Sequence, residues 1–488
     1  MGKGEDRISN LPIEILHFIL CLMPLKYAIR TSTLSKRWRH LWQINLISAT
    51  TLQFGEDFSC NQSPKQFVTT LDRYLQLHGD RNLHKFGILF SPFDVFFPNF
   101  EKWVHTVVEK GVKELEIDLS QGILDNMDGR MSFVINNSLF NGNSLTNLIL
   151  SRCNFSDPLD SANFVGLTSL SLDHVNLTDE ILTNILDNCV SLEIVCLKRC
   201  YRLNMVKFVG DKLKLRKLVM VDFSVQDMEI SAPHLESFVN HSSLPFGDGF
   251  YNVSNINDAY ICSDGWAAGY YEPFETTLAQ LSHIKVLTIS SVCVATLLWE
   301  GTTSEGYPLE LSNLQELQLV FDHLDDEPIF YLFTFFSVCP SPFLEKLFIK
   351  LTNNFEKDDT FLMTDEPDVV FENLSWIKIT NFGGSPSELK MVKFLLKKAV
   401  MLESIFIVLI DQCDISNNSS SLKIIQGQLA VIPKASKDAR IVICGPLDSD
   451  RTINPTHTTL YYQEKYRKGT TVHLNEHIFS LLDDQDFL

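Results

Sequence analysis

The sequence lacks the motifs with which many enzymes bind phosphate, zinc or acyl substrates. No Gly-x-x-x-x-Gly-Lys loop, His-Glu-x-x-His helix or Gly-x-Ser-x-Gly elbow occurs in its 488 residues. Its eleven cysteines include no Cys-x-x-Cys pair, so a zinc knuckle is not indicated. His473-Leu-Asn-Glu-His477 matches an inverted zinc-peptidase motif by letters, but without a third ligand chance spacing is the better interpretation. We therefore predict no catalytic residue, no metal and no cofactor.

Long apolar runs are also missing. The N-terminus has no apolar signal core, and the longest uncharged apolar run, residues 328–344, is interrupted by Pro340 and Pro342. We expect an intracellular, soluble protein of the nucleus or cytoplasm, or both, with reduced thiols and no membrane partner.

Basic residues are scarce overall but concentrated at one end. The net charge is −19, yet residues 1–45 hold seven basic and three acidic side chains, which leaves +4 there and −23 elsewhere. The acidic excess disfavours a nucleic-acid partner, because phosphate contacts need a basic surface. A basic head on an acidic body indicates two different roles.

The first 45 residues read as three short helices. Asn10 is expected to cap a helix that starts at Leu11-Pro12 and stops before Pro24. A second helix fits residues 25–31, and Ser35 is expected to cap a third that carries Trp38, Leu41 and Trp42. The first helix is apolar almost all round, and a module of this size cannot bury enough surface to be stable alone. It could be a helical cap on the rest of the chain, but a partner-binding module explains the excess apolar surface better.

Residues 6–16, 19–20 and 30–42, the last containing Leu-Ser-Lys-Arg-Trp, closely resemble the F-box motif in its plant form. The resemblance implies docking on an acidic Skp-type adaptor and, through it, on a cullin. Arg30, Lys36, Arg37 and Arg39 would favour the encounter with that adaptor. The residues carried over as adaptor-binding, some of which must instead form the domain's own core, are Leu11, Pro12, Ile15, Leu16, Ile19, Leu20, Leu34, Trp38 and Trp42.

The body of the chain repeats a Leu-x-x-Leu-x-Leu hexad. Twelve units start at Leu83, Val112, Leu145, Leu167, Leu192, Leu215, Leu235, Ile284, Leu314, Leu344, Leu374 and Leu402. Between Leu145 and Leu235 the intervals are 20–25 residues, the period of leucine-rich repeats, but elsewhere they lengthen. A weak unit at Ile256 could divide the gap of 49 before Ile284. The pattern predicts a degenerate solenoid with one short parallel strand per repeat.

Strand residues between the two inward apolar positions should line the concave face of this solenoid. They carry no dominant charge, and solvent exposure is the simplest expectation for any one of them. Because solenoids commonly bind proteins on this face, five are candidate target-binding residues: Ile149, Val219, Phe348, Lys378 and Phe406.

From Phe371 the pattern becomes strand, Gly383-Gly384 turn, helix and strand. An Asn/Ser loop at 416–421 and a strand at 439–444 come after it. This region resembles the FBD domain of plant proteins that combine an F-box with leucine-rich repeats. We therefore expect an F-box at 1–45, about nine or more repeats at 46–370, an FBD-type cap at 371–443 and a segment of uncertain structure at 444–488.

The combined resemblance implies an α+β or α/β solenoid: a three-helix F-box, a curved repeat array with a parallel sheet, and a closing cap. It implies a non-catalytic substrate-recognition subunit of a Skp–cullin–F-box ubiquitin ligase, which brings an unknown protein target to the ligase. Two alternatives remain open. The chain could be an interaction scaffold outside any ligase, or an F-box receptor whose target binding depends on a small molecule.

Overall fold

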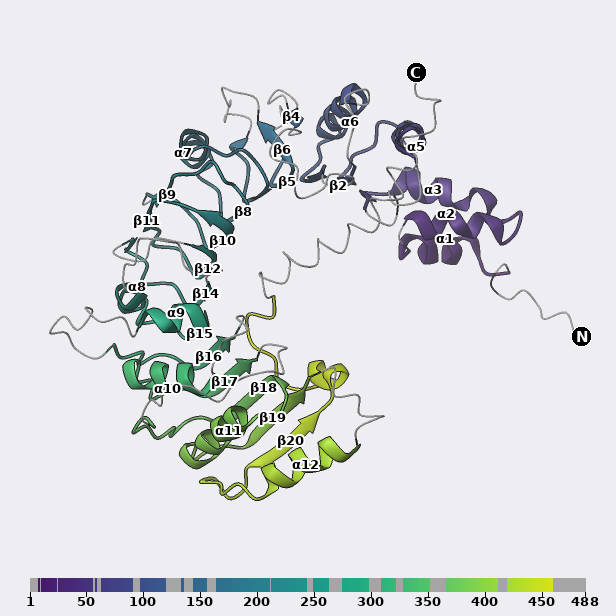
Figure 1. Cartoon of the computed structure of the whole chain (residues 1–488). Coiled ribbons are helices and arrows are strands. Elements are labelled where there is room, and N and C mark those ends of the chain that lie inside the picture. Colours follow the sequence, from purple (N-terminus) through teal and green to yellow (C-terminus); the bar gives the residue numbers. More distant parts are fainter. Residues whose placement is uncertain are drawn as a thin grey trace, which may run out of the picture. The chain divides into compact units, whose positions relative to one another are not determined.

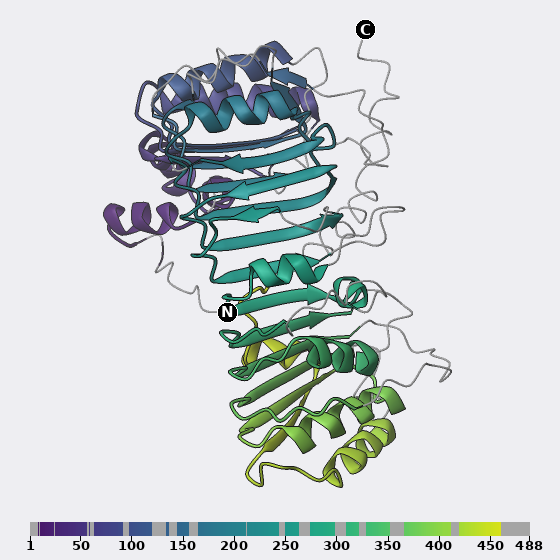
Figure 2. The same cartoon turned by 90° about the vertical axis from the view of Figure 1, so that its left-hand side faces the viewer.

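The computed structural model describes residues 8, 10–23, 25–55, 58, 63–90, 97–119, 133–135, 144–155, 164–210, 212–243, 249–262, 274–297, 309–321, 328–351, 366–410 and 419–459. The chain divides into two compact units, the first reaching Arg202 and the second starting at Leu203. In each unit parallel strands lie side by side, and helices cover one of their faces (Figures 1 and 2).

The first unit begins with the expected short helices. They are α1 (Ile13–Cys21), α2 (Leu25–Arg30), the 3₁₀ turns η1 (Thr31–Thr33) and η2 (Trp38–His40), and α3 (Leu41–Ser48). The expected Asn10 cap is wrong: Pro12 is the N-cap residue, and among the described residues no side chain caps α1. The expected Ser35 cap is also wrong: Arg37 is the N-cap residue of η2 and His40 that of α3, and neither side chain makes a capping hydrogen bond to another described residue. The third helix is shorter than expected because its first turn is the 3₁₀ turn at Trp38.

The rest of the first unit is a run of repeats. Its strands, in spatial order, are β1 (Thr51–Phe54), β2 (Lys85–Leu89), β3 (Glu114–Asp118), β5 (Asn147–Ser151), β7 (Ser169–Asp173) and β8 (Ile194–Lys198). The helices are α5 (Pro64–His78), α6 (Phe97–Glu109) and α7 (Asp179–Asn188), and β4 (Phe133–Ile135) pairs with β6 (Cys153–Phe155). A capping box between Ser63 and Gln66, with Pro64 in the first turn, fixes the start of α5.

The second unit continues the same pattern of repeats. Its main strands, in spatial order, are β10 (Lys217–Ser224), β12 (Ser237–Ser243), β14 (Asp258–Cys262), β15 (Val286–Ser290), β16 (Glu316–Val320), β17 (Lys346–Lys350), β18 (Trp376–Phe382), β19 (Ser404–Leu409) and β20 (Arg440–Cys444). A second sheet contains β9 (Met205–Val209), β11 (Asp227–Ser231) and β13 (Phe250–Tyr251). The helices are α8 (Phe274–Gln280), α9 (Ser291–Thr296), α10 (Pro328–Val338), α11 (Pro386–Lys398) and α12 (Ser419–Ala430), followed by the 3₁₀ turn η6 (Pro446–Arg451).

The hexads account for the strands. Every predicted unit places a strand two residues after its first apolar residue, as Leu145 does for β5, and the weak unit at Ile256 gives β14 in the same way. The inward leucines stack in register, with Leu148 opposite Leu170, so the core is a continuous ladder of buried aliphatic side chains. The predicted solenoid with a parallel sheet is confirmed.

The strand, Gly-Gly turn, helix and strand expected after Phe371 are present as β18, α11 and β19. The Glu388 carboxylate closes the turn by accepting hydrogen bonds from the backbone N–H groups of Gly383, Gly384 and Ser385. Strand β18 pairs with β17, so this region extends the sheet of the preceding repeats. The Asn/Ser loop expected at 416–421 is wrong from residue 419 onward, where α12 begins, and 416–418 lie outside the described residues.

Candidate functional site

The structure sorts the nine predicted adaptor-binding residues by exposure. Leu16 and Leu20 are fully buried and, with Ala28, Trp38 and Leu41, form the core of the helical head. Trp42 is also buried, and its ring lies 6.0 Å from that of Tyr74 in α5. These four predicted residues therefore hold the domain together.

The other five predicted residues reach the surface. Pro12, Ile15 and Leu34 are exposed, and Leu11 and Ile19 are half-buried. The structure adds three exposed apolar side chains from α1 and its end that sequence reasoning missed: Ile13, Phe18 and Leu22. Phe18 and Leu22 are 63% and 71% exposed. Their signal was the apolar character of α1 all round, since residues beyond the inward stripe must face outward.

Ile15, Phe18 and Leu22 share one face of α1 by their spacing, and we call these three exposed apolar side chains the head patch; Pro12, Ile13 and Leu34 are further exposed apolar residues of the same module. The exposed side chains of Arg30, Lys36, Arg37 and Arg39 belong to the same helical head. Arg37 also donates a 2.7 Å hydrogen bond to the backbone oxygen of Leu11, which ties the third helical segment to the start of the first. Apolar and cationic side chains on one small module suit an acidic protein partner.

The five predicted target-binding residues all lie on strands of the sheets, but they differ in burial. Ile149 in β5 is half-buried, whereas Val219 in β10 and Phe348 in β17 are buried. Phe406 in β19 is half-buried and stacks on Trp376, with the two ring planes 7° apart. Lys378 in β18 is only 3% exposed.

Residues 446–459, which we call the C-terminal strap, supply three polar contacts of Lys378. Its ammonium donates hydrogen bonds of 2.8–2.9 Å to the backbone oxygens of Ser449 and Ile453 and to Oδ1 of Asn454. The sequence pattern assigns no structure to residues 444–488, and residues from 460 onward lie outside the described residues.

The strap makes further contacts along the second unit. The backbone N–H of Thr456 donates to Oε1 of Glu316 in β16. His457 bridges Oγ1 of Thr288 in β15, at 2.9 Å, and Oδ1 of Asp258 in β14, at 3.0 Å. Burial alone would raise the pKa of Asp258, but the hydrogen bonds from His457 and Ser237, together with charge interactions with His457 and Lys217, outweigh it and lower that pKa. The strap therefore lies across several successive strands (Figure 1).

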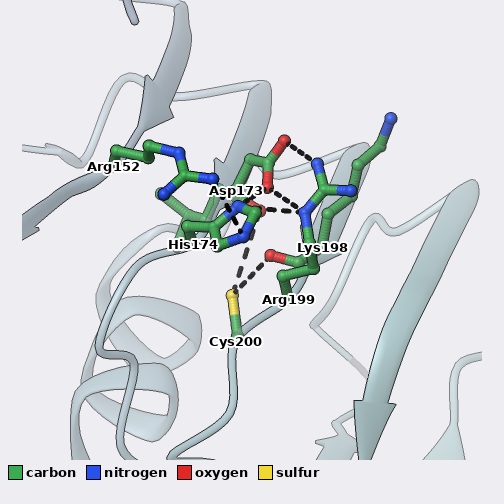
Figure 3. Close-up of polar contacts among 7 residues, drawn as sticks. Arg152, Asp173, His174, Lys198, Arg199 and Cys200 are labelled. Atoms are coloured by element: carbon green, nitrogen blue, oxygen red, sulfur yellow. Dashed lines mark hydrogen bonds and ion pairs between the residues drawn. The ribbon is translucent and has the colours of Figure 1, made fainter. Parts of the chain in front are cut away.

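A second polar cluster lies at the strand ends of the first unit, and its origin is the repeat itself. Arg152, His174 and Arg199 each follow the last residue of a strand and have left-handed backbone φ angles of 57°, 53° and 51°. Because successive repeats place these residues at the same corner, their side chains are neighbours (Figure 3). Three cationic or titratable groups in a row need a counter-charge.

Asp173 supplies that charge. Arg199 donates to both of its carboxylate oxygens, from Nε at 2.8 Å and from Nη2 at 2.5 Å, with the Arg199 side chain only 7% exposed. His174 Nδ1 lies 2.8 Å from Oδ1 of Asp173, and its Nε2 faces Arg152. Burial is the main cause that lowers the pKa of His174, which favours the neutral ring, and Nε of Arg199 also lies 2.9 Å from Nδ1 of that ring. Asp173 therefore offsets the charge of the buried Arg199, and the contacts of Arg199, Asp173, His174 and Arg152 join successive repeats.

Most of the described cysteines are buried among the repeats. Burial raises the pKa of the Cys153, Cys189, Cys200 and Cys339 thiols well above the usual range. Within the described ranges no group of three His, Cys, Asp or Glu side chains is placed to hold a metal ion, and His473 and His477 lie outside those ranges. None of the helices in the described part of the chain is long and apolar enough to span a membrane.

Comparison with known families places these features together. The family described as At1g61320/AtMIF1, LRR domain, matches residues 75–449, and the F-box domain family matches residues 8–47. The chain belongs to the F-box proteins with this type of leucine-rich repeat domain. The match to the repeat family extends over β18–β20, the region that resembles the FBD domain in sequence. The FBD domain itself is named in the descriptions of relatives such as "F-box/FBD/LRR-repeat protein At1g13570", not in those of the two matching families.

The relatives are plant proteins from Arabidopsis thaliana. The chain is 29% identical over 310 residues to "F-box protein At5g03100", covering 60% of this chain and 91% of that protein. It is 26% identical over 474 residues to "F-box/LRR-repeat protein 13", covering 91% and 98%. It is 32% identical over 202 residues to "F-box/FBD/LRR-repeat protein At1g13570", covering 40% and 45%. The match to F-box/LRR-repeat protein 13 thus extends over nearly the whole of both chains.

Proposed function

We propose that the chain is the substrate-recognition subunit of a Skp–cullin–F-box ubiquitin ligase. The observation that carries this proposal is the head patch, whose apolar side chains are exposed although the F-box is small and apolar side chains normally lie inside. Phe18 and Leu22 would be its central anchors, and Pro12, Ile15 and Leu34 would complete the contact with a Skp-type adaptor, through which a cullin is recruited.

In this proposal the chain supplies proximity and orientation, and no chemistry of its own. The F-box, expected at residues 1–45, recruits the adaptor, and the repeats, expected at 46–370, hold a protein target. Residues 371–443 would close the array, since β18–β20 continue its sheet. The alternatives are an interaction scaffold outside any ligase and a small-molecule-dependent receptor.

A matched pair of variants tests the adaptor contact. Phe18→Ala/Leu22→Ala removes two anchors of the head patch, and Phe343→Ala/Met401→Ala removes side chains that are 56% and 62% exposed outside the F-box. Hot-spot apolar side chains contribute about 2 kcal/mol or more each, so two of them contribute about 4 kcal/mol, and we expect calorimetry with purified Skp-type adaptor to show roughly a 1,000-fold loss for the first variant. The second should bind like wild type. Equal binding by both variants would remove the head patch from the proposal, and no binding by wild type would favour the scaffold.

A further inference from the structure

The side chains under the C-terminal strap form a row of hydrogen-bonding groups across the second unit. Asp258, Thr288, Glu316 and Lys378 come from β14, β15, β16 and β18, and each contacts the strap. Thr288, Glu316 and Lys378 are no more than 5% exposed. Such groups are costly to bury without partners, and the strap supplies a partner for all four, in addition to Ser237 for Asp258, Gln318 for Thr288 and Lys346 for Glu316. We call this row the polar row.

The strap crosses the strands as an extended chain. Asn454 contacts β18 and His457 contacts β15, three strand spacings away, which is about 14 Å at the usual separation of strands. Three extended residues reach only about 10 Å, so the long side chains of Lys378 and His457 span the remainder. The contacts also have a fixed order: carbonyl and amide oxygens on Lys378, a backbone N–H on Glu316, and an imidazole between Thr288 and Asp258.

Polar contacts hold most of the strap in place. Asn454, Thr456 and Thr458 are exposed and Ile453 is half-buried, whereas the His457 side chain is 11% exposed and its ring lies edge-on to that of Tyr260 at 5.7 Å. An element with little buried apolar surface opens at low free-energy cost compared with the repeats beneath it. Another extended segment that presents the same groups in the same order could therefore replace it.

We propose that the strap is a built-in competitor for a peptide-binding groove on the second unit. The groove would take an extended segment of a partner protein that presents carbonyl oxygens to Lys378, a backbone N–H to Glu316 and a histidine to Thr288 and Asp258. The inference rests on the proposed function in one respect, because it identifies this partner segment with part of the target. The sequence predicts that Lys378 binds a target. In the free chain its ammonium binds the strap instead, and the partner segment would take the place of the strap.

The test uses the full chain and a fluorescent peptide with the sequence of residues 446–459. Asn454→Ala/His457→Ala removes three of the strap's contacts and should let the peptide bind about tenfold more tightly than it binds wild type. Adding Lys378→Met to this opened chain should weaken peptide binding at least tenfold. Adding Lys397→Met, which removes a 61% exposed lysine of α11, should leave it unchanged. A peptide in which alanine replaces His457 should also bind about tenfold more weakly.

Two readouts keep the outcomes separate. Amide hydrogen exchange at Thr456 should be faster in the Asn454→Ala/His457→Ala chain, because the Thr456 N–H no longer stays hydrogen-bonded to Glu316. If circular dichroism shows that Lys378→Met is unfolded, Asp258→Asn takes its place. If the peptide binds wild type and the opened chain equally tightly, or if Lys378→Met does not weaken its binding, the strap is not a competitor for a peptide-binding groove. Binding of the Skp-type adaptor is measured on the same samples. Failure of the wild-type chain to bind the adaptor would contradict the ligase role and not the competition by the strap.

Discussion

The buried ion pair of Arg199 and Asp173 gives a prediction whose size follows from burial alone. The chain contains a matched pair elsewhere: Arg216 also donates to both oxygens of a carboxylate on the next repeat, at 3.0 and 2.9 Å from Glu236. The geometry is alike, but the side chains are 7% and 13% exposed in the first pair and 56% and 47% in the second.

Arg199→Met retains an unbranched side chain while removing both hydrogen bonds to Asp173. The carboxylate is then left buried without its guanidinium partner, although His174 remains beside it, and breaking such a pair costs about 3–5 kcal/mol of unfolding free energy. Arg216→Met leaves Glu236 in water, where solvent screens the pair, so the free energy of unfolding should change little. The double variant Asp173→Leu/Arg199→Met removes both charges and should recover most of the loss.

Urea unfolding followed by circular dichroism measures the change, and hydrogen exchange locates it. Exchange should accelerate in β7 and β8 for Arg199→Met, whereas β10 and β12 should change little in Arg216→Met. If Arg199→Met destabilises the protein no more than Arg216→Met, the argument that burial decides the value of these pairs is refuted.

Three further predictions concern single positions. The pKa of His174 is lowered in the folded chain, so its contribution to stability is present above the ordinary histidine pKa of about 6.5 and is lost as pH falls through the folded pKa. In His174→Asn, the free energy of unfolding in urea should therefore decrease less between pH 7 and pH 5 than it does in wild type. Gly384 has φ +84°, and a Cβ there would lie 3.0 Å from Ile425, so Gly384→Ala should lower the free energy of unfolding by about 1–3 kcal/mol. Gly427 lies within α12, and apart from its neighbours in the helix no described atom lies within 4 Å of the Cβ position, so Gly427→Ala should raise it by about 0.5–1 kcal/mol. Urea unfolding measures both changes. Leu16→Ala should cost about 2–5 kcal/mol of head stability by thermal unfolding, whereas retention of wild-type stability would contradict its place in the core.

The repeat strands could be predicted because they depend on a local pattern. Each hexad places apolar side chains on the inward face two residues apart, and parallel stacking results from burying them, as at Leu148 and Leu150. The outer sheet of β9, β11 and β13 was not predicted, although Met205–Val209 alternates exposed and buried residues. Its strands take the place where repeats commonly have helices, so the hexad gives no indication of them.

The candidate sites were only partly readable for a different reason. The F-box motif indicates which residues belong to the domain, but it does not show which of them are buried. Only the packing of α1 against Trp38 shows that Leu16 lies in the core and that Phe18 is exposed. The strap was beyond sequence reasoning, because the contact between His457 and Asp258 joins residues 199 positions apart and no local pattern announces it. Long-range polar contacts of this kind depend on the completed fold.

Co-migration with a cullin tests the central claim most directly. Purified full chain, Skp-type adaptor and cullin are mixed and separated by size-exclusion chromatography, with the Phe18→Ala/Leu22→Ala and Phe343→Ala/Met401→Ala variants run alongside. The chain should enter the cullin complex only when adaptor is present, the head-patch variant should elute alone, and the control variant should elute with the complex. Absence of the wild-type chain from the complex, or undiminished entry of the head-patch variant, would contradict the assignment of the head patch as the ligase-docking surface.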